Sequence, residues 1–164
     1  MENAGCTIGG IPGAGGRTEP LPNEDWSAYS RETPCFYFKG QEVYCRQLNP
    51  ERSLHEVVND GGSLWVLGGK TEEEGTAYET YNGGSTEVLG VVCAIGQNKK
   101  YPILLNDNSN VSAFMGTCGM NRMQLWPVAV REIQGNEERE FLQEDMPVWS
   151  MKNYMIPLYV GKNS

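Results

Sequence analysis

Two stretches with the same pattern decide the fold, SLWVLGGK at residues 63–70 and STEVLGVV at residues 85–92. The triplet Val66-Leu67-Gly68 returns 22 residues later as Val88-Leu89-Gly90. A repeat of this length, made of short β-runs separated by Gly, Asn and Asp turns, is typical of a β-solenoid, whose coils bury their apolar faces against one another. The sequence therefore predicts an all-β chain with a short parallel β-helix of about three to four coils.

The repeat divides the chain into three parts. Residues 1–34 are a Gly- and Pro-rich lead without a sustained period, which we expect to be irregular structure or a loose strand and to act as an interface arm. Residues 35–119 contain the coils, which begin at residues 42, 63 and 85, with a partial fourth coil over 110–118. Residues 120–164 are expected to form a β-rich C-terminal cap.

The cap is predicted from its strand and turn signals. Residues 125–133 and 140–142 flank the polar turn Gln134-Gly135-Asn136, as in a β-hairpin. A last strand over 154–160 contains Pro157, which is tolerated at a sheet edge or at a bulge. Because the open end of a solenoid exposes unpaired strand edges, this tail is predicted to cover the C-terminal end.

The core of the coils is expected to contain stacked pairs from the repeated triplet. The expected inward-facing residues are Val66, Leu67, Val88 and Leu89. Whichever of the two leucines faces inward should cost about 2–5 kcal/mol of stability when it is replaced by Ala.

Composition excludes several classes of function. The 164 residues carry a net charge of −8 with a pI near 4.7, which argues against nucleic acid as a partner, since phosphate binding needs clustered Lys and Arg. The longest apolar run, residues 88–95, is far too short for membrane insertion, and residues 1–16 lack the pattern of a secretory signal. With one His, no C-x-x-C motif and no phosphate-binding loop, neither a metal site nor a cofactor is predicted.

The five cysteines do not form a recognisable framework. Cys93 follows Val91 and Val92 and is expected to pack as a small buried hydrophobic residue. Cys35 and Cys45 flank an expected strand pair and could form a disulfide in an oxidising compartment, an alternative that the sequence leaves open.

Asp60, Asn82 and Asp107 are predicted to stack at one corner of successive coils. Asn and Asp cap their own backbone and tolerate the left-handed conformation, so a repeated turn explains them. The catalytic alternative pairs Asp60 with Asp107, with Glu87 as a further candidate, because two coil steps place the carboxylates roughly 9–10 Å apart, at the edge of the spacing in inverting glycosidases. We favour the turn.

The remaining candidates for binding or catalysis have structural explanations of their own. Glu72-Glu73-Glu74 is read as a solvated corner, with a weak cation site as the alternative. His55 has no nucleophile motif near it and is expected to be a surface or packing residue. Aromatic residues near the lead could stack on sugar rings or fill the N-terminal end of the core; these candidate ligand-binding residues are Trp26, Tyr29, Phe36 and Tyr37.

An ordered series of motifs over residues 36–161 resembles the C-terminal portion of the polygalacturonase-related, pectate-lyase-like β-helix proteins. The motifs are VYCRQLNPE at 43–51, NDGG at 59–62, LWVLGGKTE at 64–72, NGG at 82–84, TEVLG at 86–90, VRE at 130–132 and PLYVG at 157–161. The resemblance implies a right-handed parallel β-helix. It transfers no catalytic residue to any position of this chain.

Two classes of function follow. The first is a non-catalytic structural, assembly or adhesion module of an extracellular or virion-associated complex, with a glycan as a candidate ligand. The second is a carbohydrate-active enzyme, a polysaccharide hydrolase or lyase, or its C-terminal fragment. We favour the first, because three to four coils offer little surface for a polysaccharide groove and a fold alone does not establish activity. The expected partner is a second copy or a larger protein assembly, since the open coil end exposes strand edges.

Overall fold

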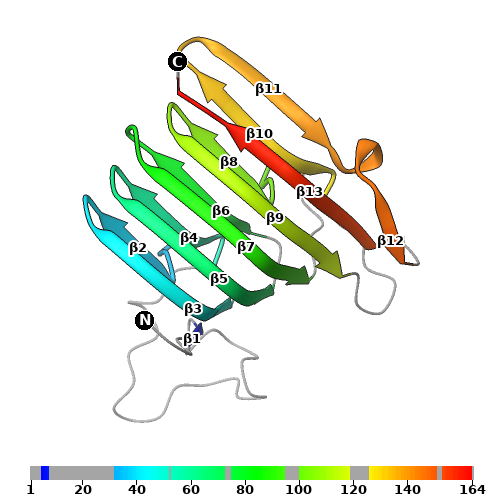
Figure 1. Ribbon diagram of the computed structural model, residues 1–164, viewed down its shortest axis with the longest axis horizontal. Coiled ribbons are helices and arrows are strands. Elements are labelled where there is room, and N and C mark those ends of the chain that lie inside the picture. The colour runs from blue at the N-terminus through cyan, green and yellow to red at the C-terminus, as the bar shows by residue number, and fades with distance from the viewer. Residues whose placement is uncertain are drawn as a thin grey trace.

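The structure, a computed structural model, describes residues 5–7, 32–51, 53–72, 75–94, 100–118, 126–150 and 153–163. These residues form a β-solenoid of about four turns, as predicted. Short and long strands alternate along the chain and stack into two sheets (Figure 1). No helix in the described part of the chain is both long and apolar enough to cross a bilayer.

The long strands form sheet A, in the order β1-β3-β5-β7-β9-β13-β12. Its parallel members come first, and the two strands at its C-terminal edge run antiparallel to their neighbours. The strands of sheet A are β1 (Gly5–Thr7), β3 (Glu42–Glu51), β5 (Ser63–Glu72), β7 (Ser85–Ala94), β9 (Asn110–Cys118), β12 (Val148–Ser150) and β13 (Asn153–Gly161). The long strands begin at the residues predicted as coil starts, 42, 63, 85 and 110.

The short strands form sheet B, in the order β11-β10-β8-β6-β4-β2. All are parallel except β11, which pairs antiparallel with β10. The strands of sheet B are β2 (Phe36–Lys39), β4 (His55–Asp60), β6 (Thr76–Tyr81), β8 (Leu104–Asp107), β10 (Val128–Gln134) and β11 (Glu137–Leu142). A single 3-10 turn, Gln143–Asp145, follows β11 in the described chain.

Each coil bends where a residue adopts a left-handed conformation, and the coils that contain β3, β5 and β7 do so twice. The corner between a short and a long strand contains Gly40, Gly61, Asn82 and Asn108, with φ of 59°, 71°, 56° and 47°. The second bend lies inside the long strands, at Gln47, Gly68 and Gly90, with φ of 54°, 71° and 72°. Gly and Asn carry the lowest cost for this conformation, which explains their recurrence in each coil.

The core fills the space between the sheets. From sheet A, Cys45, Val66, Val88 and Ala113 lie in register on four successive strands and are at most 2% exposed. From sheet B, a second row consists of Val57, Tyr78, Leu104 and Val130, none more than 1% exposed. Rows of this kind bury each coil only against its neighbours, as expected for a solenoid.

The expectation for the repeated triplet was wrong at its leucines. Val66 and Val88 face inward, whereas Leu67 and Leu89 are 56% and 36% exposed on the outer face of sheet A. Successive side chains of a strand point to opposite faces, so the inward valines force both leucines outward.

The strand register predicts different effects for alanine substitutions at the neighbouring residues Val66 and Leu67. Val66→Ala should lower the free energy of unfolding by about 2–3 kcal/mol, because two buried methyl groups are lost and a cavity remains. Leu67→Ala, one residue away, should change it by less than about 0.5 kcal/mol in dilute protein. Equilibrium urea denaturation of the two variants measures the difference. Equal losses would contradict the register.

The C-terminal cap has the predicted strands. The β10–β11 hairpin turns at Gly135 and Asn136 and adds two strands to sheet B. β13 pairs antiparallel with β9, and its register shifts between Ile156 and Tyr159, where Pro157 lies. Both sheets therefore end in antiparallel strands, and the proline occupies the irregularity at which its missing N–H is tolerated.

The predicted lead of residues 1–34 lies mostly outside the described residues. Its described strand, β1, pairs in parallel with residues 49–51 of β3. The cysteine pairing left open by the sequence is absent from the structure, where Cys35 and Cys45 are both reduced thiols and the Cys35 thiol donates to the Glu51 carbonyl oxygen at 3.3 Å. Burial raises the pKa of Cys45. Cys93 is completely buried, as expected, and burial raises its pKa to about 12.

Candidate functional site

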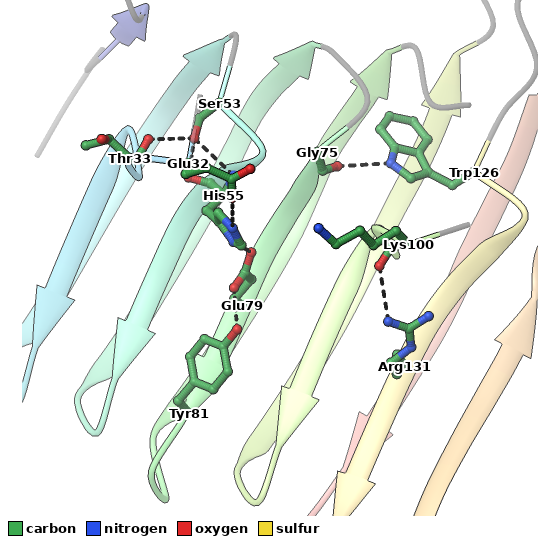
Figure 2. Close-up of polar contacts among 10 residues, drawn as sticks. All are labelled: Glu32, Thr33, Ser53, His55, Gly75, Glu79, Tyr81, Lys100, Trp126 and Arg131. Atoms are coloured by element: carbon green, nitrogen blue, oxygen red, sulfur yellow. Dashed lines mark hydrogen bonds and ion pairs between the residues drawn. The ribbon is translucent and has the colours of Figure 1, made fainter. Parts of the chain in front are cut away.

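A network of ionisable side chains lies on the outer face of sheet B (Figure 2). His55 is the first residue of β4, and Glu79 and Tyr81 belong to the neighbouring strand β6. The His55 Nδ1 atom lies 2.5 Å from Oε1 of Glu79, and the Tyr81 hydroxyl donates to the other oxygen of that carboxylate. Glu79 is only 3% exposed, so a charged carboxylate is held below the surface by these two partners.

The pKa values follow from this geometry. The hydrogen bond to Glu79 raises the pKa of His55 above 6.5, and burial opposes the shift only in part. Burial and the Glu79 carboxylate raise the pKa of the Tyr81 hydroxyl well above its ordinary value. The contact with Glu79 therefore favours the protonated form of His55, and Tyr81 stays neutral.

Two further groups surround the imidazole. Its Nε2 atom lies 3.4 Å from Oε2 of Glu32, an exposed residue that precedes β2. The Tyr101 ring meets His55 edge-on, with ring centroids 6.1 Å apart, and Lys100 lies over the Tyr101 ring at 4.9 Å. On the far side, Arg131 donates to the Lys100 carbonyl oxygen at 3.1 Å.

Ser53 lies close to His55 but does not complete a Ser-His-Glu triad. Its hydroxyl contacts the backbone oxygens of Thr33 and His55, at 2.7 and 2.9 Å, and accepts from the His55 backbone N–H. Ser53 is completely buried, and its hydroxyl is engaged by these backbone atoms. A hydroxyl held in this way is not presented to a substrate, so the arrangement can hold or release a proton at His55 without using Ser53 as a nucleophile.

The corner residues predicted from the sequence lie together, with one correction. Register places Asp60 beside Tyr81, and the same register continues to Asp107, so the column is Asp-Tyr-Asp. Asn82 lies one position further along, where Gly61 and Asn108 also adopt a left-handed conformation. The turn between β6 and β7 is one residue longer than the turns of the other coils. For this reason the 22-residue repeat aligned Asn82, rather than Tyr81, with Asp60.

Each corner carboxylate has local partners. Asp60 accepts from the Tyr37 hydroxyl at 2.5 Å and from the Asn82 amide at 2.6 Å, and these bonds lower its pKa. Asp107 accepts from the amide of Asn108 at 2.6 Å. Glu87, the third carboxylate candidate, lies on sheet A in register with Trp65 and Ser112. The structure therefore places Asp60 and Asp107 at a turn and Glu87 on another sheet.

The predicted aromatic residues are only partly described. Trp26 and Tyr29 lie outside the described residues. Phe36 packs against the core, and the 52% exposed Tyr37 is bound to Asp60. In the acidic loop, Glu72 accepts from Lys70 at 2.6 Å, while Glu73 and Glu74 are not described. No group of three or more His, Cys, Asp or Glu among the described residues is arranged to hold a metal ion.

A surface that the sequence analysis did not predict lies on sheet A. Nine large apolar side chains are conspicuously exposed among the described residues, and eight of them belong to strands of sheet A. They are Tyr44, Leu67, Leu89, Val92, Phe114, Val148, Leu158 and Val160. The signal was present in the sequence as the leucine of each Val-Leu-Gly triplet, which we had assigned to the core.

The exposed apolar residues form rows along the stack. Leu67, Leu89 and Phe114 occupy matching positions on β5, β7 and β9. In the neighbouring row, Tyr44 stacks on Trp65 with ring centroids 4.6 Å apart and planes inclined by 8°. We call the eight exposed residues together with Trp65 the sheet A face.

Comparison with known proteins leaves the family open: no family model, no curated protein and no solved structure matches the chain.

Proposed function

We propose that the chain is a non-catalytic assembly module, a rigid β-solenoid that associates with a second copy of itself through the sheet A face. The observation that carries this proposal is that, in the described part of the chain, eight of the nine exposed large apolar residues lie on one sheet. Monomeric soluble proteins rarely expose a large contiguous apolar patch, and such patches are typical of interaction surfaces.

The surface is chemically suited to its own copy. The outward residues of β9 and β13 include Ser112, Phe114, Leu158 and Val160, which carry no charge. The β9–β13 end of the face can therefore pack against its copy without burying an unpaired charge, which would be costly. Charged residues lie in the rows of the other strands, where Arg46 pairs with Leu67, Glu87 with Trp65 and Lys70 with Val92, so that end belongs to the rim of the interface. A twofold axis brings the same patch of both copies together, the commonest arrangement in homo-oligomers, and packed sheets of this kind lie about 10 Å apart.

The resemblance to polygalacturonase-related β-helix proteins supports an extracellular or virion-associated setting for such a module, and membership of that superfamily is part of the proposal. The enzymatic alternative has less support. Its three candidate carboxylates, Asp60, Asp107 and Glu87, are divided between a turn and another sheet. Asp60 and Asp107 have local hydrogen-bond partners that a turn requires.

Sedimentation equilibrium tests the proposal. We expect the protein to associate at tens of micromolar, and the double variant Leu89→Lys/Phe114→Lys to raise the dissociation constant roughly 30-fold or more, the equivalent of about 2 kcal/mol from one central contact. Both side chains are exposed, at 36% and 41%, so the variant should remain folded.

The matched control is Tyr37→Lys, which changes the one exposed large aromatic side chain on sheet B. It should leave the dissociation constant unchanged. A monomeric wild-type protein at these concentrations would rule out self-association, and equal effects of the two sets of substitutions would rule out the sheet A face.

A further inference from the structure

The strands β4 and β6 are buried on both of their faces, unlike the long strands. In β4 the four central residues are all buried, and in β6 the first five are, whereas β5 alternates between buried and exposed positions. Val57 and Tyr78 face the core, so Val58 and Glu79 point outward, yet these two residues are only 5% and 3% exposed. The outer face of sheet B is therefore covered at Val58 and Glu79, whereas Tyr37, which pairs with Val58, is 52% exposed.

Two segments approach this outer face and meet at His55. On one side, the Cys35 N–H donates to the His55 carbonyl oxygen at 3.3 Å, and Ser53 donates to the Thr33 carbonyl oxygen at 2.7 Å. These bonds attach residues 32–35 to the start of β4. On the other side, Tyr101 is 7% exposed and packs edge-on against the imidazole ring. We call residues 32–35 and 100–103 the covering segments.

The net charge around the His55–Glu79 contact depends on whether the imidazole of His55 is protonated. Titratable groups face His55 from every element packed around it. Strand β6 contributes Glu79 and Tyr81, and Asp107 lies near Tyr81. The covering segments contribute Glu32, Lys100 and Tyr101, and β10 contributes Arg131. Arg131 is already paired with Glu138 and Glu140. His55 is therefore the cation in direct contact with the buried Glu79 carboxylate.

We propose that His55 and Glu79 form a pH-operated latch, which holds the covering segments on sheet B while His55 is protonated and releases them when the proton is lost. The physical reason is that deprotonation leaves the Glu79 carboxylate buried without its cation, which favours opening of the cover to water. The latch is independent of the proposed self-association, which uses the opposite sheet.

The direction of the pH dependence follows from the His55 pKa, which the hydrogen bond to Glu79 raises above 6.5. A group whose pKa is raised in the folded state contributes its full stabilisation when the pH is below the pKa that the group has in the unfolded state. The stabilisation is lost as the pH rises through the raised pKa. The latch is therefore closed below about pH 6.5 and opens as the pH rises through the raised pKa of His55.

The titration can be measured directly, because His55 is the sole histidine of the chain and gives one imidazole C2–H signal by proton NMR. We expect its midpoint above 6.5 in the wild-type protein and a lower midpoint in Glu79→Gln. Glu32→Gln, which alters an exposed carboxylate at 3.4 Å, should give an intermediate midpoint and cannot affect the core. An unchanged midpoint in Glu79→Gln would overturn the proposal.

Opening is read from hydrogen exchange at the Cys35 and Ile103 amides, which donate to the carbonyl oxygens of His55 and Val128. After correction for the intrinsic rate, the opening equilibrium constant should grow by up to about tenfold per pH unit between pH 6.5 and the His55 midpoint, and level off above that midpoint. The Val88 amide in β7 is the internal control and should not change. His55→Gln should open the cover at every pH, and full protection of Cys35 and Ile103 in that variant, or in the wild-type protein above the midpoint, would exclude the latch.

Discussion

Replacing Trp126 with Ala is expected to lower the free energy of unfolding by about 3–5 kcal/mol, the largest loss predicted for any single side chain of this protein. Trp126 is 1% exposed and precedes β10 at the junction of the coils and the cap. Its indole Nε1 donates to the Gly75 carbonyl oxygen at 3.0 Å, 51 residues away along the chain (Figure 2). The substitution removes both the packing of a large ring and a buried hydrogen bond.

A second variant separates the two contributions. Trp126→Phe keeps most of the apolar volume but loses the donor, so it should cost roughly 1–3 kcal/mol, the range for a buried polar group that loses its partner. Guanidinium denaturation followed by circular dichroism measures both variants.

Trp65→Ala is the matched control, because Trp65 is the same residue type on the outer face of β5, half-buried against Tyr44. We expect a loss of about 1 kcal/mol, from the aromatic stack alone. If Trp65→Ala and Trp126→Ala were equally destabilising, the junction would not depend on Trp126.

The coil starts were predictable from the sequence because the turn chemistry repeats with the coils. Gly61 has its counterpart at Asn82 or Gly83 in the next coil, and Gly68 has its counterpart at Gly90. These positions need a left-handed backbone, which most side chains disfavour. Such constraints act on single residues, so they are visible without knowledge of the partners. Gly69 is the opposite case, since a Cβ there would lie 2.4 Å from the Leu48 carbonyl oxygen of the preceding coil, a constraint that exists only once the coils are stacked.

The facing of the triplet leucines was not predictable from composition, because an apolar residue on an outer face looks the same as one in the core. Leu67 and Leu89 were assigned inward for this reason. Strict alternation from Val66 would have placed them outward. The error concealed the sheet A face, which is where the sequence departs from the usual pattern of polar outward residues.

The contact between His55 and Glu79 depends on information that no local pattern contains. The two residues are 24 positions apart, and their approach requires the register of β4 against β6, in which His55 pairs with Thr76. It also requires the covering segments, whose position follows from tertiary packing. From the sequence alone, His55 was therefore expected to be a surface or packing residue, and its buried carboxylate partner was not predicted.

Asn59 provides the second large prediction, because its side chain holds two coils together inside the core. It is completely buried, in a row with Thr80 and Asn106 along the inner side of sheet B. Its Oδ1 accepts from the Gly62 N–H at 3.1 Å, and its Nδ2 donates to the Ser85 carbonyl oxygen at 3.0 Å in the next coil. The same amide group donates to the Thr86 hydroxyl at 2.9 Å.

Asn59→Leu should lower the free energy of unfolding by roughly 2–4 kcal/mol, although it adds apolar volume. The reason is that the Gly62 N–H loses its Asn59 acceptor and the Ser85 carbonyl its Asn59 donor inside the core, where each lost partner costs about 1–3 kcal/mol. Urea denaturation is the measurement. Asn82→Leu is unsuitable as a control, because Asn82 has a left-handed backbone.

Asn49→Leu is the better control, since Asn49 is a half-buried asparagine on β3 with normal strand geometry and a long 3.3 Å contact to Glu51. It should cost less than about 1 kcal/mol, as most surface substitutions do. A loss for Asn59→Leu no larger than this control would mean that the polar row does not join the coils. A loss in the predicted range would show that this solenoid is held in register by buried amide bonds as well as by its apolar rows, because a one-residue slip would break every bond that Asn59 makes.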